Sequence, residues 1–293
     1  MKIVHTLGLA LATTAVAQSP LPEDVKVVGT TLSQVRKSPD AYRGVWIRLT
    51  VQYASLGKIS NPFFTQFEPS KFANFYAWAD EQAIWKKAQY EDLFGLFFVD
   101  KQTKIAAQLY NLKVFRRLEI VGVVRNVFQG KPWIEVTQMN ILQKRVNTAT
   151  LSHVYRAETH MKKRQWKRAI SELSLAPGKE LPDRVRCEIH KNLAMCFLRL
   201  GESATAVEHL GSAVSLLQGA DDAIRNMMRV ARTTPESFLD RTVANSQVED
   251  YQRPMWEAFE GQGESSVTTD TPSLTEPTPA PAHRPDPSPG SKK

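Results

Sequence analysis

Apolar and polar residues alternate strictly along residues 45–51, where every second side chain is apolar. This period of two predicts a strand with one buried face. Further strands are predicted at residues 72–79, 93–99, 114–125 and 133–141. Residues 104–112, between the third and fourth of these strands, follow the helical period, and a short helical turn is expected at residues 31–37. The front of the chain therefore predicts three strands, a helix and two strands.

This order of elements is that of the OB-fold, a five-stranded Greek-key barrel. Two stretches, SPDAYRGVWIRLTV from Ser38 and YAWADEQAIWKKAQYEDLFGLFFVDK from Tyr76, resemble OB-like domains of exported bacterial proteins. The resemblance covers residues 25–145 and implies an OB-like barrel over that range. Gly122, inside the fourth strand, fits a bend or bulge of such a barrel.

The predicted barrel is rich in aromatic residues, with ten in residues 63–94 alone. OB-folds commonly bind oligonucleotides or oligosaccharides on one face, and aromatic rings with basic neighbours form stacking platforms for single-stranded nucleic acid. The candidate polymer-binding residues are Tyr76, Trp78, Trp85 and Lys86. The alternative is that the rings fill and cap the barrel. Inward-pointing rings would exclude polymer binding, whereas three or more rings in an open basic groove would favour it.

The back of the chain contains an internal repeat with an offset of 37 residues, over residues 151–217. Small and large apolar residues recur at matched places: Ala157 and Ala194, Ala169 and Ala206, Leu173 and Leu210, Ala176 and Ala213. These spacings resemble the tetratricopeptide repeat (TPR), a helix–turn–helix unit of about 34 residues. The first copy departs from the pattern, because Arg164 stands where the second copy has Gly201. Within residues 218–260, residues 221–231 predict a further helix that caps the array.

The TPR resemblance also implies where a partner would bind. Such repeats use the inner face of the first helix of each pair, which here carries basic, acidic and apolar side chains: Val154, Glu158, Met161, Lys162, Lys191, Met195, Leu198 and Arg199. Basic and apolar groups together suit an acidic, extended peptide. The alternative is that the two repeats pack on the barrel and bind nothing.

The two ends of the chain differ from its middle. Lys2, an apolar stretch over residues 3–16 and an Ala-Val-Ala motif ending at Ala17 are typical of a cleaved signal peptide, residues 1–17. The stretch is too short to span a membrane, so we expect a mature chain without a transmembrane segment, in the periplasm, the cell envelope or outside the cell. Residues 261–293 hold seven of the 17 prolines and no aromatic residue, which predicts a disordered tail.

Composition and motifs narrow the function classes. The 293 residues carry a net charge of +8, which favours acidic partners. The chain has no phosphate-binding glycine motif, nucleophile elbow or zinc-protease motif, and we expect no catalytic residue, metal or cofactor. Cys187 and Cys196 lie on one predicted helix about 13 Å apart, too far for a disulfide.

These observations predict an α+β multidomain protein: an N-terminal five-stranded OB-like β barrel followed by an α-helical TPR-like hairpin array. The predicted function is an exported, non-enzymatic adaptor that binds an acidic protein or peptide through the TPR-like groove. The alternative is a module that binds polysaccharide or nucleic acid through the aromatic-rich barrel, although export argues against nucleic acid.

Overall fold

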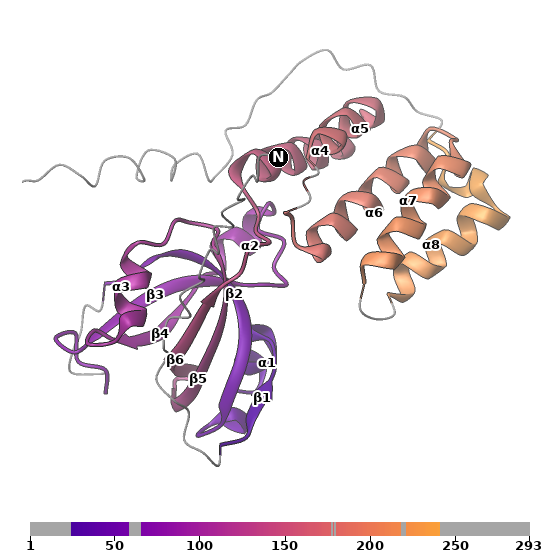
Figure 1. Ribbon diagram of the computed structural model, residues 1–293. Helices are drawn as coiled ribbons and strands as arrows, with labels where there is room; N and C mark the ends of the chain where they lie inside the picture. The colour runs from indigo at the N-terminus through magenta and orange to yellow at the C-terminus, as the bar shows by residue number, and fades with distance from the viewer. Residues whose placement is uncertain (1–24, 59–65, 177, 179, 218–220, 241–293) are drawn as a thin grey trace, which may run out of the picture.

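The computed structural model describes residues 25–58, 66–176, 178, 180–217 and 221–240. Within these ranges a β barrel stands at one end of the molecule and a set of helices at the other (Figure 1). The predicted signal peptide, the Pro-rich tail and the extension beyond residue 240 lie outside the described residues.

The barrel has the five strands that the hydrophobic pattern predicts. They are β2 (Trp46–Leu56), β3 (Phe72–Ala79), β4 (Phe94–Asp100), β5 (Arg117–Phe128) and β6 (Lys131–Ile141). Strand β2 pairs antiparallel with both β3 and β5, and a short parallel pairing of β4 with β6 closes the barrel. Helix α3 (Lys104–Tyr110) lies between β4 and β5 in the chain, as predicted. A short strand that the pattern missed, β1 (Val27–Gly29), pairs parallel with β2, and helix α1 (Leu32–Lys37) follows it.

Local sequence accounts for the turns and bends of the barrel. Gln129 and Gly130 both have positive φ, so the β5–β6 hairpin turns through a two-residue loop of the kind that suits the twist of a sheet. Gly122 lies at a register shift between β5 and β6. A Cβ atom there would stand 2.4 Å from the Glu135 carbonyl oxygen. The predicted bulge at Gly122 is therefore present, and only glycine fits it.

The helical part contains two hairpins and a fifth helix. The hairpins are α4 (Thr148–Lys162) with α5 (Trp166–Leu175), and α6 (Asp183–Arg199) with α7 (Ser203–Leu216), and α8 (Asp222–Thr233) follows them. The repeated alanines at 157, 169, 194, 206 and 213 are all fully buried. Small residues at these places let the helices approach closely.

The two hairpins turn in the same way despite their different residues. Gly201 ends α6 with φ of 84°, and Arg164 ends α4 with φ of 56°. Gln165 N donates to His160 O and Glu202 N donates to Phe197 O, each at 2.9 Å. Both turns are therefore the same left-handed helix end, 37 residues apart. Arg164 adopts a conformation that its side chain disfavours.

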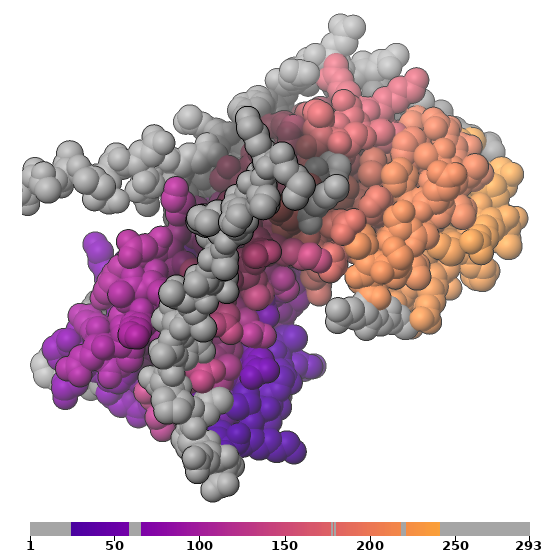
Figure 2. Space-filling view, in the orientation of Figure 1, coloured from indigo at the N-terminus to yellow at the C-terminus, as the bar shows by residue number. Residues whose placement is uncertain are grey.

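A hydrophobic cluster spans the junction between the barrel and the helices, in addition to the core of the barrel and the core of α6, α7 and α8. A single buried cluster joins barrel residues such as Trp78 and Phe115 to helical residues such as Val154 and Leu193. The two parts also abut in the space-filling view (Figure 2). The first hairpin therefore lies against the outer surface of the barrel, with the segment at residues 80–93 between them, and α7 and α8 pack with α6 farther away.

Candidate functional site

The tryptophans proposed for polymer binding lie inside the protein. Trp78 is fully buried, stacks on Phe115 with ring centroids 5.5 Å apart, and donates through Nε1 to the Tyr90 carbonyl oxygen at 2.7 Å. Trp85 is 5% exposed. Neither ring offers a free face to a ligand, so the prediction that these two residues stack on a polymer is wrong. Tyr76 is half-buried and Lys86 is exposed.

Most described aromatic side chains of the 63–94 segment point inward. Phe67, Phe75, Tyr90 and Phe94 are each at most 7% exposed, and Phe63 and Phe64 lie outside the described residues. Phe75 stacks on Phe97 in the barrel core, and Tyr90 lies in the cluster beneath the helices. Phe67 belongs to neither cluster and stacks on Phe98 and Trp133. The aromatic richness therefore reflects two hydrophobic cores that meet at β3 and a separate ring stack around Phe67.

The residues expected to form a helical groove do not share one open face. Glu158 accepts a hydrogen bond from Trp85 Nε1 at 2.7 Å and therefore faces the barrel. Leu198 is 1% exposed, in the core between α6, α7 and α8. The Arg199 guanidinium lies over the Trp166 ring and donates to the Phe238 carbonyl oxygen.

The remaining predicted groove residues are scattered. Lys191 pairs with Glu188 at 3.3 Å on its own helix, Met195 is half-buried, and Lys162 is exposed. The predicted single groove of Glu158, Lys162, Lys191, Met195, Leu198 and Arg199 is therefore wrong for Glu158, Leu198 and Arg199. The barrel, the helical core and the 3₁₀ turn at Pro235–Phe238 cover them.

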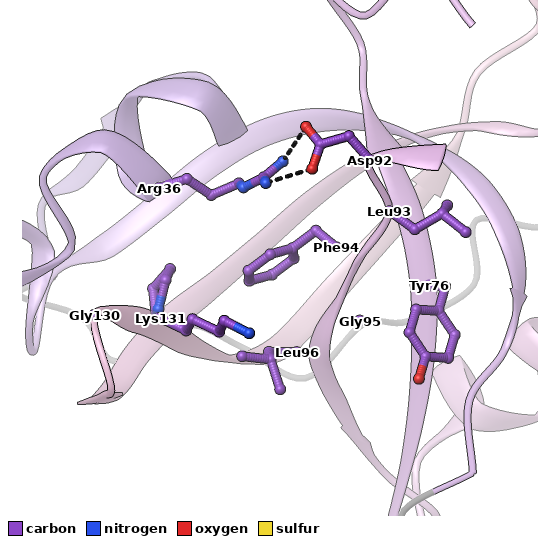
Figure 3. A pocket seen from close by; sticks show the side chains of 10 residues that line it. Arg36, Tyr76, Asp92, Leu93, Phe94, Gly95, Leu96, Gly130 and Lys131 are labelled. Carbon is purple, nitrogen blue, oxygen red and sulfur yellow. Dashed lines mark hydrogen bonds and ion pairs between the residues drawn. The ribbon is translucent and has the colours of Figure 1, made fainter. Parts of the chain in front are cut away.

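A groove of about 540 Å³ opens instead on the barrel, where β4 and β6 separate. The two strands pair at only two positions, Phe97 with Ile134 and Phe98 with Glu135. On the N-terminal side of these pairs the strands diverge. The groove is lined by both strands, by β3 and by α1, through Arg36, Tyr76, Asp92, Leu93, Phe94, Gly95, Leu96, Gly130, Lys131 and Pro132 (Figure 3).

Two features of the sequence separate the strands here. On β4, Gly95 and Leu96 together oppose the single residue Tyr76, which makes a β-bulge. On β6, Pro132 has no backbone N–H to donate to a neighbouring strand. A bulge bends the strand that carries it, so β4 leaves the ladder just where β6 lacks a donor.

Gly95 is needed for the packing of the groove wall. A Cβ atom at this position would lie 2.1 Å from Tyr76 Cε1. The tyrosine ring therefore covers the glycine, and Tyr76 stands beside Gly95 in the close view (Figure 3). Tyr76 is the one candidate polymer-binding residue that reaches this groove. A glycine inside a strand pattern signals a bulge or a close approach, and Gly95 was the sequence signal that could have located the site.

The groove combines an apolar wall with charged ends. Leu93 is 36% exposed, and Leu96 is half-buried. Arg36 and Asp92 form a bidentate ion pair at 2.6 and 3.0 Å, so their charges compensate each other. Lys131 is exposed and has no ion pair with any residue that the structure describes. Its amino end lies beside Leu96 (Figure 3). The groove therefore offers hydrophobic contacts and one uncompensated positive charge.

We also searched the described part of the chain for metal-binding groups, reactive cysteines and membrane-spanning helices. It contains no group of three or more His, Cys, Asp or Glu side chains that could hold a metal ion. Cys187 and Cys196 are both free and buried, as predicted, and burial raises the pKa of Cys196 to about 12. No helix among the described residues is long and apolar enough to cross a membrane.

One titratable pair lies away from the groove. His190 on α6 and His209 on α7 bring their Nδ1 atoms within 3.0 Å of each other. Burial lowers the pKa of both side chains. Phe197 stacks on the His209 ring with centroids 5.4 Å apart. The pair therefore joins the two helices of the second hairpin in its neutral form.

Comparisons of the chain with protein-family models, with curated proteins and with solved structures find no match. The functional conclusion therefore depends on the geometry of the groove and on the chemistry of its lining residues.

Proposed function

We propose that this protein is a non-enzymatic adaptor that binds an extended polypeptide segment of a partner protein in the groove between β4 and β6. One observation carries the proposal: the barrel opens at this place into a groove with an apolar wall and a lysine that has no ion pair among the described residues. A groove of about 540 Å³ falls in the range of about 300–1,000 Å³ that is usual for ligand sites. We keep export from the cytoplasm as part of this proposal, on the basis of residues 1–17.

The groove favours a polypeptide over a polysaccharide or a nucleic acid. Polymers of both kinds bind by stacking on several exposed rings, and Tyr76 and Phe94 are the only described aromatic residues that line this groove. Phe94 is 5% exposed, so its ring has little free surface. A nucleic acid would also need several phosphate-binding cations, whereas the groove has one uncompensated lysine.

In this proposal the helical hairpins are a support for the groove. The segment at residues 80–93 leads directly into the groove wall at Leu93, and its Trp85 is bound to Glu158 on α4. Gln82 Nε2 donates to the Asp92 carbonyl oxygen at 3.0 Å, which fixes the end of the groove formed by Asp92 and Leu93. We infer that the hairpins are TPR-like, because their matched turns and buried alanines recur 37 residues apart. Their partner-binding role is then taken by the barrel.

A selection for peptide binding tests this function. A library of random 12-residue peptides displayed on phage would be selected against the protein beginning at residue 18. We expect bound sequences whose affinity for the soluble protein falls at least tenfold in Leu93→Asp, since an exposed carboxylate would replace the apolar wall. Lys162→Glu, which reverses an exposed charge on α4, is the matched control and should keep wild-type affinity. Failure to select any peptide would refute polypeptide binding.

A further inference from the structure

Before its two pairs with β6, the β4 edge that faces the groove has no paired strand among the described residues. Strand β4 pairs with β3 from Phe94 opposite Ala77 to Asp100 opposite Phe72, interrupted by the bulge at Gly95 and Leu96. Its other edge is paired only at Phe97 and Phe98. The backbone of residues 94–96 therefore lacks a ladder partner on the groove side among the described residues. The Gly95 carbonyl oxygen accepts a hydrogen bond from the Asn74 side chain of β3 at 3.2 Å, so the remaining N–H and carbonyl groups of this segment on the groove side are the ones offered to a partner. A free strand edge is a template for another extended chain.

We infer that the partner segment binds by strand addition to β4, in the gap between β4 and β6, with an acidic side chain next to Lys131. This inference rests on the proposed function and adds the mode of recognition to it. Strand addition uses main-chain hydrogen bonds for affinity and alternate side chains for specificity. An added strand would continue the sheet where the barrel's own ladder is interrupted.

The opposite wall of the groove explains why β4 is the strand that accepts the partner. Residues Lys131 and Pro132 of β6 already pair with Phe128 and Val127 of β5. Pro132 cannot donate to a second neighbour, because it has no N–H. Strand β6 therefore contributes a side wall and the charge of Lys131, and β4 contributes the backbone groups.

The lining side chains define the chemistry of the segment. Leu93, Leu96 and Tyr76 form an apolar surface along the β4 side of the groove. The positive charge of Arg36 is already compensated by Asp92 at 2.6 Å. Lys131 therefore attracts an acidic partner more strongly than Arg36 does. We therefore expect a segment in which apolar residues alternate with polar ones and an acidic residue occupies the Lys131 end. The closing parallel pairs at Phe97 and Phe98 limit the segment to a few residues along β4.

The experiment compares backbone and side-chain recognition with the same selected peptides. Hydrogen exchange of the full protein would be followed with and without a selected peptide. We expect slower exchange of the amides at residues 94–96 in the complex. A peptide N-methylated at its central residues, which removes backbone donors, should bind at least tenfold more weakly than its parent. Lys131→Glu should weaken binding of acidic peptides at least tenfold, and Lys131→Gln by less.

Two results would overturn the inference, and they distinguish failure of strand addition from failure of the proposed function. Peptides that lose affinity in Leu93→Asp, but bind equally well when N-methylated and protect no amide at residues 94–96, would show side-chain binding without strand addition. Peptides that are insensitive to Leu93→Asp and to Lys131→Glu, but lose affinity in Lys162→Glu, would place binding on the helices. That second result would overturn the proposed site as well.

Discussion

Trp85 and Glu158 form a hydrogen bond, from Nε1 to Oε1 at 2.7 Å, across the junction of the barrel and the helices. Trp85 belongs to the segment between β3 and β4, and Glu158 lies on α4. Lys86 Nζ lies 3.8 Å from the same carboxylate. Two residues that the sequence assigned to separate ligand-binding surfaces are thus partners of each other. Their bond holds the segment that continues into the groove wall.

Removal of the Glu158 carboxylate should destabilise the whole molecule. Glu158→Ala leaves a largely buried indole N–H without its acceptor, and a hydrogen bond to a charged group contributes about 1.5–3 kcal/mol. We expect the free energy of unfolding in urea to fall by that order. Glu158→Gln keeps an acceptor oxygen and should lose less, and Glu208→Ala, at an exposed acid in the middle of α7, should be nearly neutral. Equal stability of Glu158→Ala and wild type would mean that the junction does not depend on this bond.

The positive φ of Arg164 predicts a stabilising substitution. A left-handed conformation costs a residue with a side chain about 1–2 kcal/mol relative to its usual conformations. Glycine avoids that cost but has more freedom in the unfolded chain. Arg164→Gly also gives up a 3.6 Å ion pair with Asp240, in which the arginine side chain is 56% exposed. We therefore expect a net gain of up to about 1 kcal/mol in thermal or urea unfolding.

The matched turn of the second hairpin supplies the control. Gly201→Ala should destabilise the protein, because φ at Gly201 is 84° and a Cβ atom would stand 3.3 Å from Leu239 Cδ1. Opposite signs for Arg164→Gly and Gly201→Ala would confirm that the turns are equivalent. A destabilising Arg164→Gly would contradict the left-handed conformation at Arg164.

Ala206 should tolerate no larger side chain. It is fully buried at the crossing of α6 and α7, among Ala194, Leu198 and Leu210. Ala206→Leu forces extra methyl groups into this packed crossing, which typically costs about 1–3 kcal/mol. Ala204→Leu, two residues earlier at an exposed position of the same helix, is the control and should leave the melting temperature nearly constant. Identical melting of Ala206→Leu and wild type would refute the packing of this hairpin.

The histidine pair predicts loss of stability in acid. The pKa of His190 is lowered by burial, by His209 and by Arg186, and that of His209 is lowered by burial, which outweighs the opposite effect of Glu208. The unfolded chain then takes up protons at its ordinary value near 6.5 before the folded chain does. The stabilisation is complete above that pH and declines as the pH falls below it toward the folded values.

Urea unfolding at a series of pH values from 7.5 to 5 measures this decline. We expect the free energy of unfolding to fall less steeply with decreasing pH in His209→Gln than in wild type, because one titrating group of the pair is gone. His153→Gln, at a histidine on α4 that contacts Glu172, provides a comparison away from the pair. Parallel pH profiles for wild type and His209→Gln would contradict the assigned direction of the two pKa values.

Local patterns in the sequence determine most of the elements but not their contacts. The alternation at residues 45–51 and the apolar and aromatic runs that follow it located the five barrel strands. The offset of 37 residues located the four helices of the hairpins. The pattern could not say which face of β3 meets solvent, because most of its residues are buried on both faces. Phe75 and Ala77 point into the barrel core, and Trp78 packs into the cluster under the helices. From its sequence alone, an aromatic strand that is buried on both faces cannot be distinguished from one that exposes its rings to a ligand.

The sequence did not predict the groove either, because the groove also depends on contacts between distant parts of the chain. It depends on the separation of β4 from β6, two strands that are far apart in the chain and pair only in the folded barrel. The local causes are visible in the sequence as Gly95 and Pro132. Their effect appears only when the two strands are neighbours. In the same way, Glu158 and Leu198 lie on the helix faces that the repeat pattern indicated, but the barrel and α8 occupy those faces.

Site-specific photo-crosslinking tests the central claim most directly. A photo-reactive amino acid would replace Leu93 in the groove or Lys162 on α4, in the full-length chain expressed in its native cells. After illumination we predict a discrete protein adduct from position 93 that disappears when Lys131→Glu is introduced into the same chain, and no adduct from position 162. An adduct from position 162 together with none from position 93 would contradict the account and return partner binding to the helices.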